Sequence, residues 1–214
     1  LDWWSYVAGQ VPGFPVDSSV YHFHPVALAG ALWSEGSKLS LEEARVRAFL
    51  RMIRIGEGTQ GASGYEKLFG GSSFVKDHGR DFSDHPRIVI SKGSYRSSAA
   101  GAYQVMGYTW DDPGQKALRK KYDITDFLPG SQDRYGAVIL RHKRRALDDI
   151  KAGRIREAIN KCNLEWASLP GSPHGQPTVD WNVVLAGFDN FLNDEMSGNS
   201  DLAITPGAMD DILG

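Results

Sequence analysis

The stretch SLEEARVRAFLRMIRIGEG, residues 40–58, decides how the chain folds. Ser40 is followed three residues later by Glu43, which is the capping-box pattern that begins a helix. Gly56 and Gly58 flank Glu57 and end the pattern, because glycine favours the left-handed conformation that closes a helix. Between these ends, apolar residues recur at helical spacing: Val46, Phe49, Leu50 and Ile53. We therefore expect an amphipathic helix that packs against the main core.

Glu57 is the residue of that helix with the most chemical promise. It follows Ile53 by four residues and Leu50 by seven, so it shares their apolar face. Burial and the negative end of the helix dipole both disfavour a carboxylate, and both raise the pKa of Glu57. A carboxyl group that stays protonated near neutral pH can act as a general acid, and the flanking glycines leave room for a ligand. The alternative is an ordinary glutamate that turns to solvent at a fraying helix end.

The sequence after Glu57 changes character twice. Residues 59–95 are rich in glycine, serine and charge, and two β-prone pieces, 73–75 and 87–90, predict a small hairpin or irregular sheet. From residue 96 the patterns are helical. Asp112-Pro113 begins one helix, Ser131 caps another that we expect to reach about residue 150, and apolar stripes mark two more over 155–166 and 181–192.

These patterns divide the 214 residues into three parts. Residues 1–40 are an N-terminal extension of unknown role, 41–195 are the expected catalytic domain, and the polar tail 196–214 is expected to be loosely held. The net charge of −2 gives no sign of nucleic-acid binding. The single cysteine, Cys162, excludes an intrachain disulfide and is expected to be inert core. No apolar run approaches the roughly 18 residues that span a bilayer, so we expect no stable membrane insertion.

Several strings of the chain resemble the lambda-type phage endolysins, which are lytic transglycosylases of the lysozyme-like superfamily. The strings keep the same order over about residues 45–193, and strings as long as WASLPG and SDHPR do not arise from composition. They are RAFL at 47–50, GEGT at 56–59, GY at 64–65, GG at 70–71, FSDHPR at 82–87, SSAAGAYQ at 97–104, SQD at 131–133, DI at 149–150, REAI at 156–159, Cys162, and WASLPG at 166–171.

The resemblance implies an α+β lysozyme-like fold in which a small β-hairpin region and a mainly helical lobe flank a glycan cleft. It places the family's catalytic glutamate on Glu57 and its Tyr-Gln pair on Tyr103 and Gln104. It also implies a monomer that needs no cofactor and acts on peptidoglycan glycan strands in the bacterial periplasm and cell wall. This chain departs from the family in a shorter loop between Glu57 and Gly64, and in having Ala102 before Tyr103.

The number of carboxylates separates the possible activities. A lytic transglycosylase needs one, because the C6 hydroxyl of the sugar attacks its own anomeric carbon to form a 1,6-anhydro ring. A hydrolytic lysozyme needs a second, and Glu66, nine residues after Glu57, is the candidate. We prefer the one-carboxylate interpretation because the longer strings resemble the lambda type. The alternative outside enzymes is a non-catalytic wall-binding or virion structural domain.

Other residues are weaker candidates. Tyr65 could stack on a sugar, and Ser97 and Ser98 could donate hydrogen bonds to acetamido groups, although serines at this place also cap helices. Gly101 is among the small residues expected to line the cleft with Tyr103. Trp166 lies on a helical stripe and is expected in the core.

Two charged motifs complete the set of candidates. His22 and His24 have strand spacing, but two ligands without a third make a weak metal site, so we expect no metal. The basic run 141–145 is either a solvated helix face or a surface that attracts anionic wall polymer.

Overall fold

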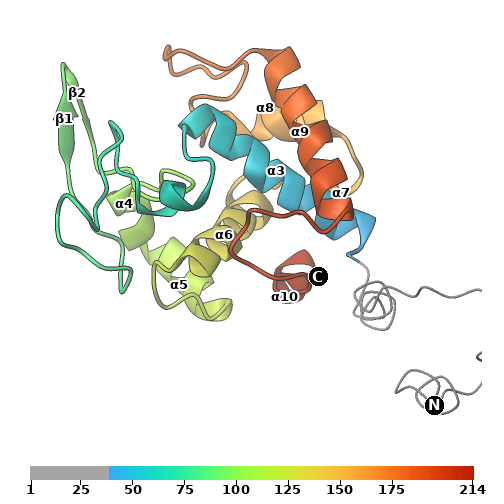
Figure 1. The fold of residues 1–214 in the computed structure, drawn as a ribbon, viewed down its shortest axis with the longest axis horizontal. Coiled ribbons are helices and arrows are strands. Elements are labelled where there is room, and N and C mark those ends of the chain that lie inside the picture. The colour runs from blue at the N-terminus through green and yellow to red at the C-terminus, as the bar shows by residue number, and fades with distance from the viewer. Residues whose placement is uncertain (1–38) are drawn as a thin grey trace, which may run out of the picture. The chain divides into compact units, whose positions relative to one another are not determined.

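A computed structural model describes residues 39–214, which form one compact unit. The extension 1–40 and the pair His22 and His24 fall almost wholly outside this part, so their roles stay predictions. Helix α3 (Leu41–Glu57) runs through the middle of the helical lobe. Around it lie α6 (Pro129–Val138), α7 (Leu147–Lys151), α8 (Ile155–Cys162) and α9 (Trp181–Met196) (Figure 1). The only sheet in the described residues is the hairpin of β1 (Ile90–Lys92) and β2 (Tyr95–Ser97), paired with Ile90 opposite Ser97.

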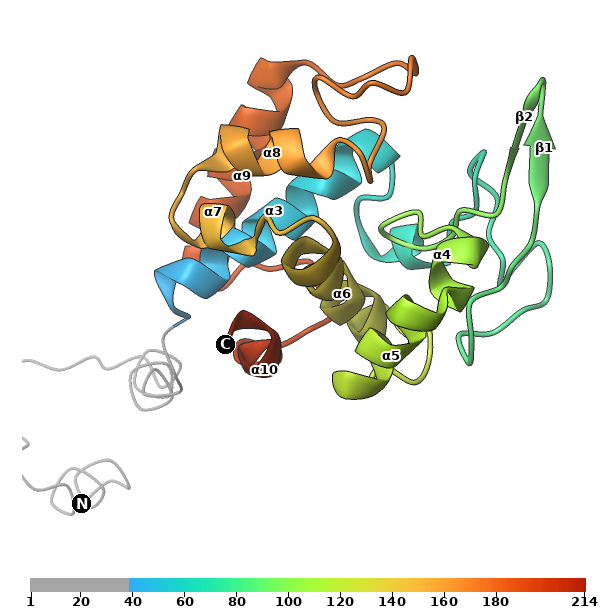
Figure 2. The ribbon, with the colours of Figure 1, turned by 180° about the vertical axis from the view of Figure 1, so that it is seen from behind.

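The hairpin and the helical lobe lie at opposite ends of the unit. Figure 2, the view from behind, shows β1 and β2 at one edge and α7 to α9 at the other. Short elements connect them: η1 (Ala62–Glu66), α4 (Gly107–Asp111) and α5 (Pro113–Lys121), with α10 (Asp210–Leu213) at the chain end. This is the predicted α+β architecture, with one helical lobe and one small β region.

Helix α3 forms as its sequence predicts. The Ser40 side chain accepts a hydrogen bond from the backbone N–H of Glu43, and Gly58 closes the helix in the left-handed conformation. The whole apolar stripe from Val46 to Ile53 is buried. The Glu43 carboxylate does not return to the cap, however, and instead accepts a hydrogen bond from Gly207 at 2.9 Å.

Two predicted elements differ from the structure. The piece 73–75 makes only a single bridge, between Ser73 and Lys67, because Phe74 turns into the core. The helix expected from Ser131 to about residue 150 begins at Pro129 and is broken. It widens into the single π-turn η2 (Ile139–Lys143), and Arg145 then adopts a positive φ of 53° before α7 begins.

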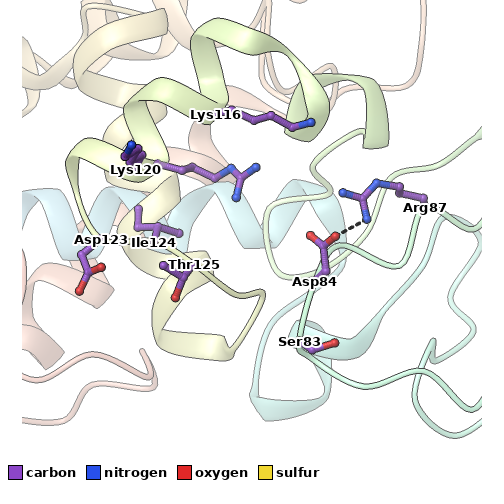
Figure 3. Close-up of a pocket in the computed structure, with 9 residues that line it drawn as sticks. Ser83, Asp84, Arg87, Lys116, Lys120, Asp123, Ile124 and Thr125 are labelled. Atoms are coloured by element: carbon purple, nitrogen blue, oxygen red, sulfur yellow. Dashed lines mark hydrogen bonds and ion pairs between the residues drawn. The ribbon is translucent and has the colours of Figure 1, made fainter.

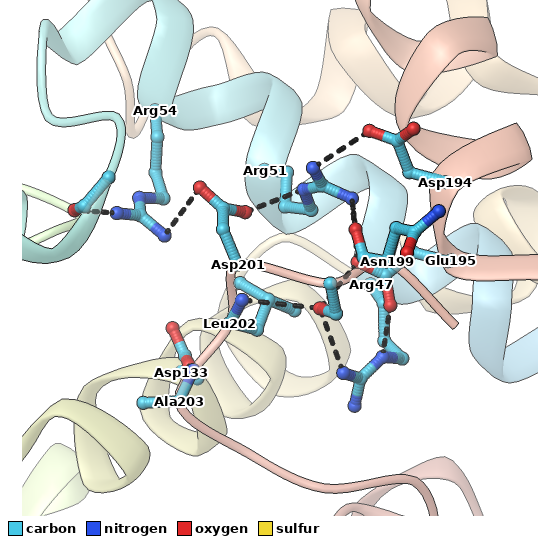
Figure 4. Close-up of polar contacts among 12 residues, drawn as sticks. Arg47, Arg51, Arg54, Asp133, Asp194, Glu195, Asn199, Asp201, Leu202 and Ala203 are labelled. Carbon is cyan, nitrogen blue, oxygen red and sulfur yellow. Dashed lines mark hydrogen bonds and ion pairs between the residues drawn. The ribbon is translucent and has the colours of Figure 1, made fainter. Parts of the chain in front are cut away.

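The tail 196–214 was expected to be loosely held, and that expectation is wrong. Four of its apolar side chains, Leu202, Ile204, Met209 and Ile212, belong to the buried core. A line of arginines on α3 binds the same segment (Figure 4). Arg51 pairs with Asp201 of the tail at 2.6 Å, and Arg47 donates to the Ile204 carbonyl at 3.0 Å. Both arginines also bind Glu195 near the end of α9, at 2.9 and 2.6 Å. Buried guanidinium groups need such partners, so the tail is part of the support of α3.

Candidate active site at the end of helix α3

Glu57 occupies the last position of α3, and its side chain is partly buried. The Ser168 hydroxyl donates a hydrogen bond to Glu57 Oε1 at 2.6 Å. Burial raises the pKa of Glu57, and the Ser168 hydrogen bond opposes part of that rise by stabilising the carboxylate. The predicted environment is therefore confirmed, with burial as its main cause.

Ser168 is the site residue that our reading of the residues missed. It reaches Glu57 because Gly56 has no side chain: a Cβ on Gly56 would stand 2.4 Å from Ser168 Oγ and 2.8 Å from its Cβ. The Ser168 carbonyl also accepts a hydrogen bond from Val179 at 2.8 Å, which ties together the two ends of the loop that precedes α9. Gly56 thus makes room for the protein's own loop, whereas we had expected it to make room for a ligand. The signal was present in the WASLPG string, which contains Ser168.

The turn after Glu57 is held to the middle of the chain by three contacts. Lys67 Nζ donates to the Gly58 carbonyl at 2.6 Å, so a cation lies at the negative end of α3. The buried Thr59 hydroxyl donates to the Ala102 carbonyl at 2.5 Å. Arg54 donates to the carbonyl of Thr59 at 2.9 and 3.0 Å. These bonds fix the direction in which the end of α3 points.

Gln104 lies beside this turn. Its backbone has a φ of 46°, and its side-chain Nε2 donates to the carbonyls of Gly101 at 3.0 Å and of Lys67 at 3.3 Å. Lys67 therefore connects Gln104 to the Gly58 carbonyl next to Glu57. Gln104 is half-buried, and its contact with a glycan stays a prediction.

The aromatic candidates lie in the core. Tyr103 is 2% exposed and Tyr65 is 4% exposed, and both hydroxyls donate to the buried Asp133 carboxylate, at 2.7 Å and 2.9–3.0 Å. Neither ring is accessible for stacking on a sugar, which contradicts the contacts predicted for them. Trp166 is core as expected, and its indole N–H donates to the Tyr103 carbonyl at 3.0 Å.

The small candidates have structural tasks. Gly101 is buried with a φ of +76°, and a Cβ there would stand 2.2 Å from Gln132 Oε1, so it forms a tight turn and does not face a ligand. Ser98 accepts a hydrogen bond from the backbone N–H of Gly107 at 3.0 Å, while the N-cap residue of α4 is Met106. Ser97 accepts from Ala99 at 3.1 Å. Neither serine is the N-cap residue of a described helix, so the capping alternative is wrong, and their contacts with acetamido groups stay predictions.

Glu66, the candidate second carboxylate, is already paired. Its Oε1 lies 2.8 Å from Lys76 Nζ, and only 14% of its side chain is exposed.

Within residues 39–214 no group of three or more histidine, cysteine or acidic side chains is arranged to hold a metal. No helix there is long and apolar enough to cross a membrane. In the basic run, Lys143 and Arg144 pair with Glu165, while Arg141 and Arg145 line a cavity of about 400 Å³. Neither that cavity nor a larger one of about 840 Å³ includes Glu57.

Comparison with known proteins agrees with this geometry. The model of the family described as Endolysin matches residues 47–193. The chain belongs to the endolysin family. It is 40% identical to the endolysin of Escherichia phage lambda over 151 residues, which are 66% of this chain and 87% of that protein. It is also 37% identical to the endolysin of Escherichia phage P2 over 142 residues, which are 61% of this chain and 82% of that one.

Solved structures show the same fold. The structure of bacteriophage lambda lysozyme complexed with a chitohexasaccharide matches this endolysin-family chain with a TM-score of 0.60 and 35% identity, covering 69% of this chain and 94% of that one. A second structure of the lambda lysozyme matches with a TM-score of 0.52 and 31% identity, covering 73% and 94%. The predicted lysozyme-like α+β fold is therefore confirmed.

Proposed function

We propose that this endolysin-family protein degrades peptidoglycan as a lytic transglycosylase, with Glu57 first as general acid and then as general base. Membership of the endolysin family and the lambda lysozyme fold support peptidoglycan degradation. The observation that carries the catalytic assignment is the half-buried carboxyl of Glu57, which has a raised pKa and one oxygen bound by Ser168. A glycan substrate agrees with the structure of the lambda lysozyme complexed with a chitohexasaccharide.

The hydrogen bond from Ser168 gives the two carboxyl oxygens of Glu57 different tasks. Oε1 accepts from the hydroxyl, which leaves Oε2 to carry the proton. A fixed orientation of the acid matters because proton transfer requires hydrogen-bond reach to the leaving oxygen. Burial keeps the proton in place until a sugar oxygen arrives.

The reaction balances without water. The proton on Glu57 passes to the bridging oxygen as the bond from that oxygen to the anomeric carbon of N-acetylmuramic acid breaks. The C6 hydroxyl of the same ring then bonds to the anomeric carbon, and its proton passes to the Glu57 carboxylate. The products are a 1,6-anhydro-N-acetylmuramic acid end and a free C4 hydroxyl on N-acetylglucosamine, and the enzyme returns to its starting protonation state. An attack within one ring gains from proximity.

The environment of Glu66 supports the one-carboxylate route. A hydrolytic enzyme needs a second carboxylate that attacks the sugar or activates a water. Glu66 is bound by Lys76 at 2.8 Å, so its lone pairs are partly occupied and its charge is balanced.

Digestion of purified cell walls in heavy-oxygen water tests the proposal. We expect mass spectrometry to show anhydro ends, one water lighter than hydrolytic products and free of label. Substantial label at new reducing ends would assign a hydrolase that acts on the host wall. A protein that binds walls without releasing any fragments would be the non-catalytic alternative.

A further inference from the structure

The larger cavity of the described residues, about 840 Å³, lies between α5 and the segment that precedes the hairpin. Figure 3 shows Lys116 and Lys120 on one side and Arg87 with Asp84 on the other. Its lining contains four cations and two carboxylates, and a third carboxylate outside the lining, Asp111, pairs with Arg87 and Lys116. The lining residues are Ser83, Asp84, Arg87, Lys116, Arg119, Lys120, Asp123, Ile124 and Thr125.

Arg119 is the central group of this cavity. It is 8% exposed, its guanidinium lies 3.6 Å from the centre of the Trp110 ring, and its Nη2 donates to the Trp110 carbonyl at 3.0 Å. Within residues 39–214 no carboxylate lies within ion-pair distance of it, and its Nε has no hydrogen-bond acceptor. Burial lowers the pKa of the Arg119 guanidinium. A buried cation without a counter-ion is costly to keep, and the stacking on Trp110 holds this one rigidly.

Other polar side chains that line the cavity differ in whether they already have a partner within the protein. Lys120, next to it on α5, makes no ion pair among the described residues, and the Thr125 hydroxyl makes no hydrogen bond there. The Asp84 carboxylate, by contrast, is fully used, since Arg87 binds it at 2.5 Å and the Trp110 indole N–H at 2.7 Å. The carboxylate of Asp123, an exposed residue of the lining, makes no ion pair there either, so the free groups are two cations, one hydroxyl and one carboxylate.

We propose that this cavity is a binding site for a phosphate group, held by Arg119 and Lys120 with Lys116 at its rim. A rigid guanidinium fork beside lysine point charges is the arrangement that suits phosphate oxygens. Arg119 and Lys120 are the two lining cations that make no ion pair among the described residues. The cavity shares no lining residue with the candidate active site, so the ligand would tether the enzyme to a phosphate-bearing molecule without touching the cleavage chemistry.

The probe for this proposal is inorganic phosphate, added to the full chain at pH 7 and constant ionic strength with chloride as the reference anion. The Nε–H of Arg119 is buried and hence protected from exchange, so nitrogen–proton NMR can follow it directly. We expect a saturable shift of this signal. Lys120→Gln should weaken phosphate binding about fivefold, as expected for the loss of one charge-assisted contact.

Lys121→Gln is the matched control, because it removes the same charge from the same helix at a residue that does not line the cavity. Its affinity for phosphate should equal that of the wild type. A shift that grows linearly with phosphate, or an equal loss in both variants, would overturn the proposal, since either result describes general screening. Both substitutions are at exposed residues, so the fold is not at risk.

Vesicles that contain phosphatidic acid distinguish two sources of the phosphate. Binding to them that free phosphate competes away would assign a lipid headgroup. Absence of vesicle binding together with saturable binding of free phosphate would assign a soluble phosphate. Both results support the site. Wall lysis by Lys120→Gln should stay at the wild-type rate in either case.

Discussion

Replacement of Ser168 by alanine tests the candidate site most directly, because it removes one hydrogen bond and leaves Glu57 in place. The hydroxyl donates to Glu57 Oε1 at 2.6 Å and is only partly buried. A hydrogen bond to a charged group contributes about 1.5–3 kcal/mol, and one to a neutral group about 1 kcal/mol. A protonated Glu57 is neutral, so we expect the variant to lose about 1 to 2 kcal/mol of transition-state stabilisation, or roughly 5- to 30-fold in rate.

For the same variant we also predict the direction in which the pH dependence of the rate changes. Ser168 stabilises the carboxylate form, so its loss raises the pKa of Glu57 further. The acid then stays protonated to higher pH, and the alkaline limb of the rate profile should move upward while the maximum rate falls. A purely structural role for Ser168 would lower the rate and leave this limb in place.

The assay is turbidity loss of purified walls between pH 4 and 9, with thermal unfolding measured in parallel. Ser172→Ala is the control, since Ser172 lies in the same loop and its hydroxyl accepts only from His174, at 3.4 Å. The control should match the wild type. An unchanged rate and profile in Ser168→Ala would refute the assignment of this hydrogen bond to catalysis.

Four further variants extend the test. Glu57→Gln should lower wall lysis by about 10²- to 10⁴-fold, as expected for the loss of a general acid, whereas Glu66→Gln should cost far less; equal losses in lysis assays would favour the two-carboxylate lysozyme. Gly56→Ala should lower both activity and melting temperature, because its Cβ would stand 2.4 Å from Ser168 Oγ, and a crystal structure with the loop unmoved would contradict this. Burial raises the pKa of Asp133 from 3.8 to about 6. The contribution of Asp133 to the free energy of unfolding is therefore full below pH 4, and it falls by about 3 kcal/mol as the pH rises through 6. Denaturant titrations should therefore show the deficit of Asp133→Asn shrinking between pH 4 and pH 7, and a constant deficit would exclude the shift.

The sequence predicted α3 and its reactive carboxyl because the information there is local. A cap at Ser40, an apolar stripe and a glycine stop agree with one another, and each acts within a few residues. The placement of Glu57 on the apolar face follows from helical periodicity alone. The family resemblance then added the fold as a whole, which no local pattern determines.

The predictions that the structure contradicts have one cause in common: they depend on contacts between segments that are distant in the sequence. Tyr103 and Gln104 are neighbours, yet Tyr103 turns inward because Asp133, thirty residues later, accepts its hydroxyl, while Gln104 stays half-exposed. Ser168 reaches Glu57 across 111 residues. The break after α6 depends on Arg145 adopting a positive φ, which its side chain gives no local reason to do. Periodicity carries none of this information.

The arginines of α3 also determine when this helix can pack during synthesis of the chain. Arg47 and Arg51 emerge from the ribosome early, but their carboxylate partners Glu195 and Asp201 follow about 150 residues later. Until that segment arrives, burying these guanidinium groups would cost several kcal/mol each. The helix that ends in Glu57 therefore cannot settle into its final packing before this segment is made. A product whose synthesis stops before Glu195 would leave α3, and with it Glu57, without these partners.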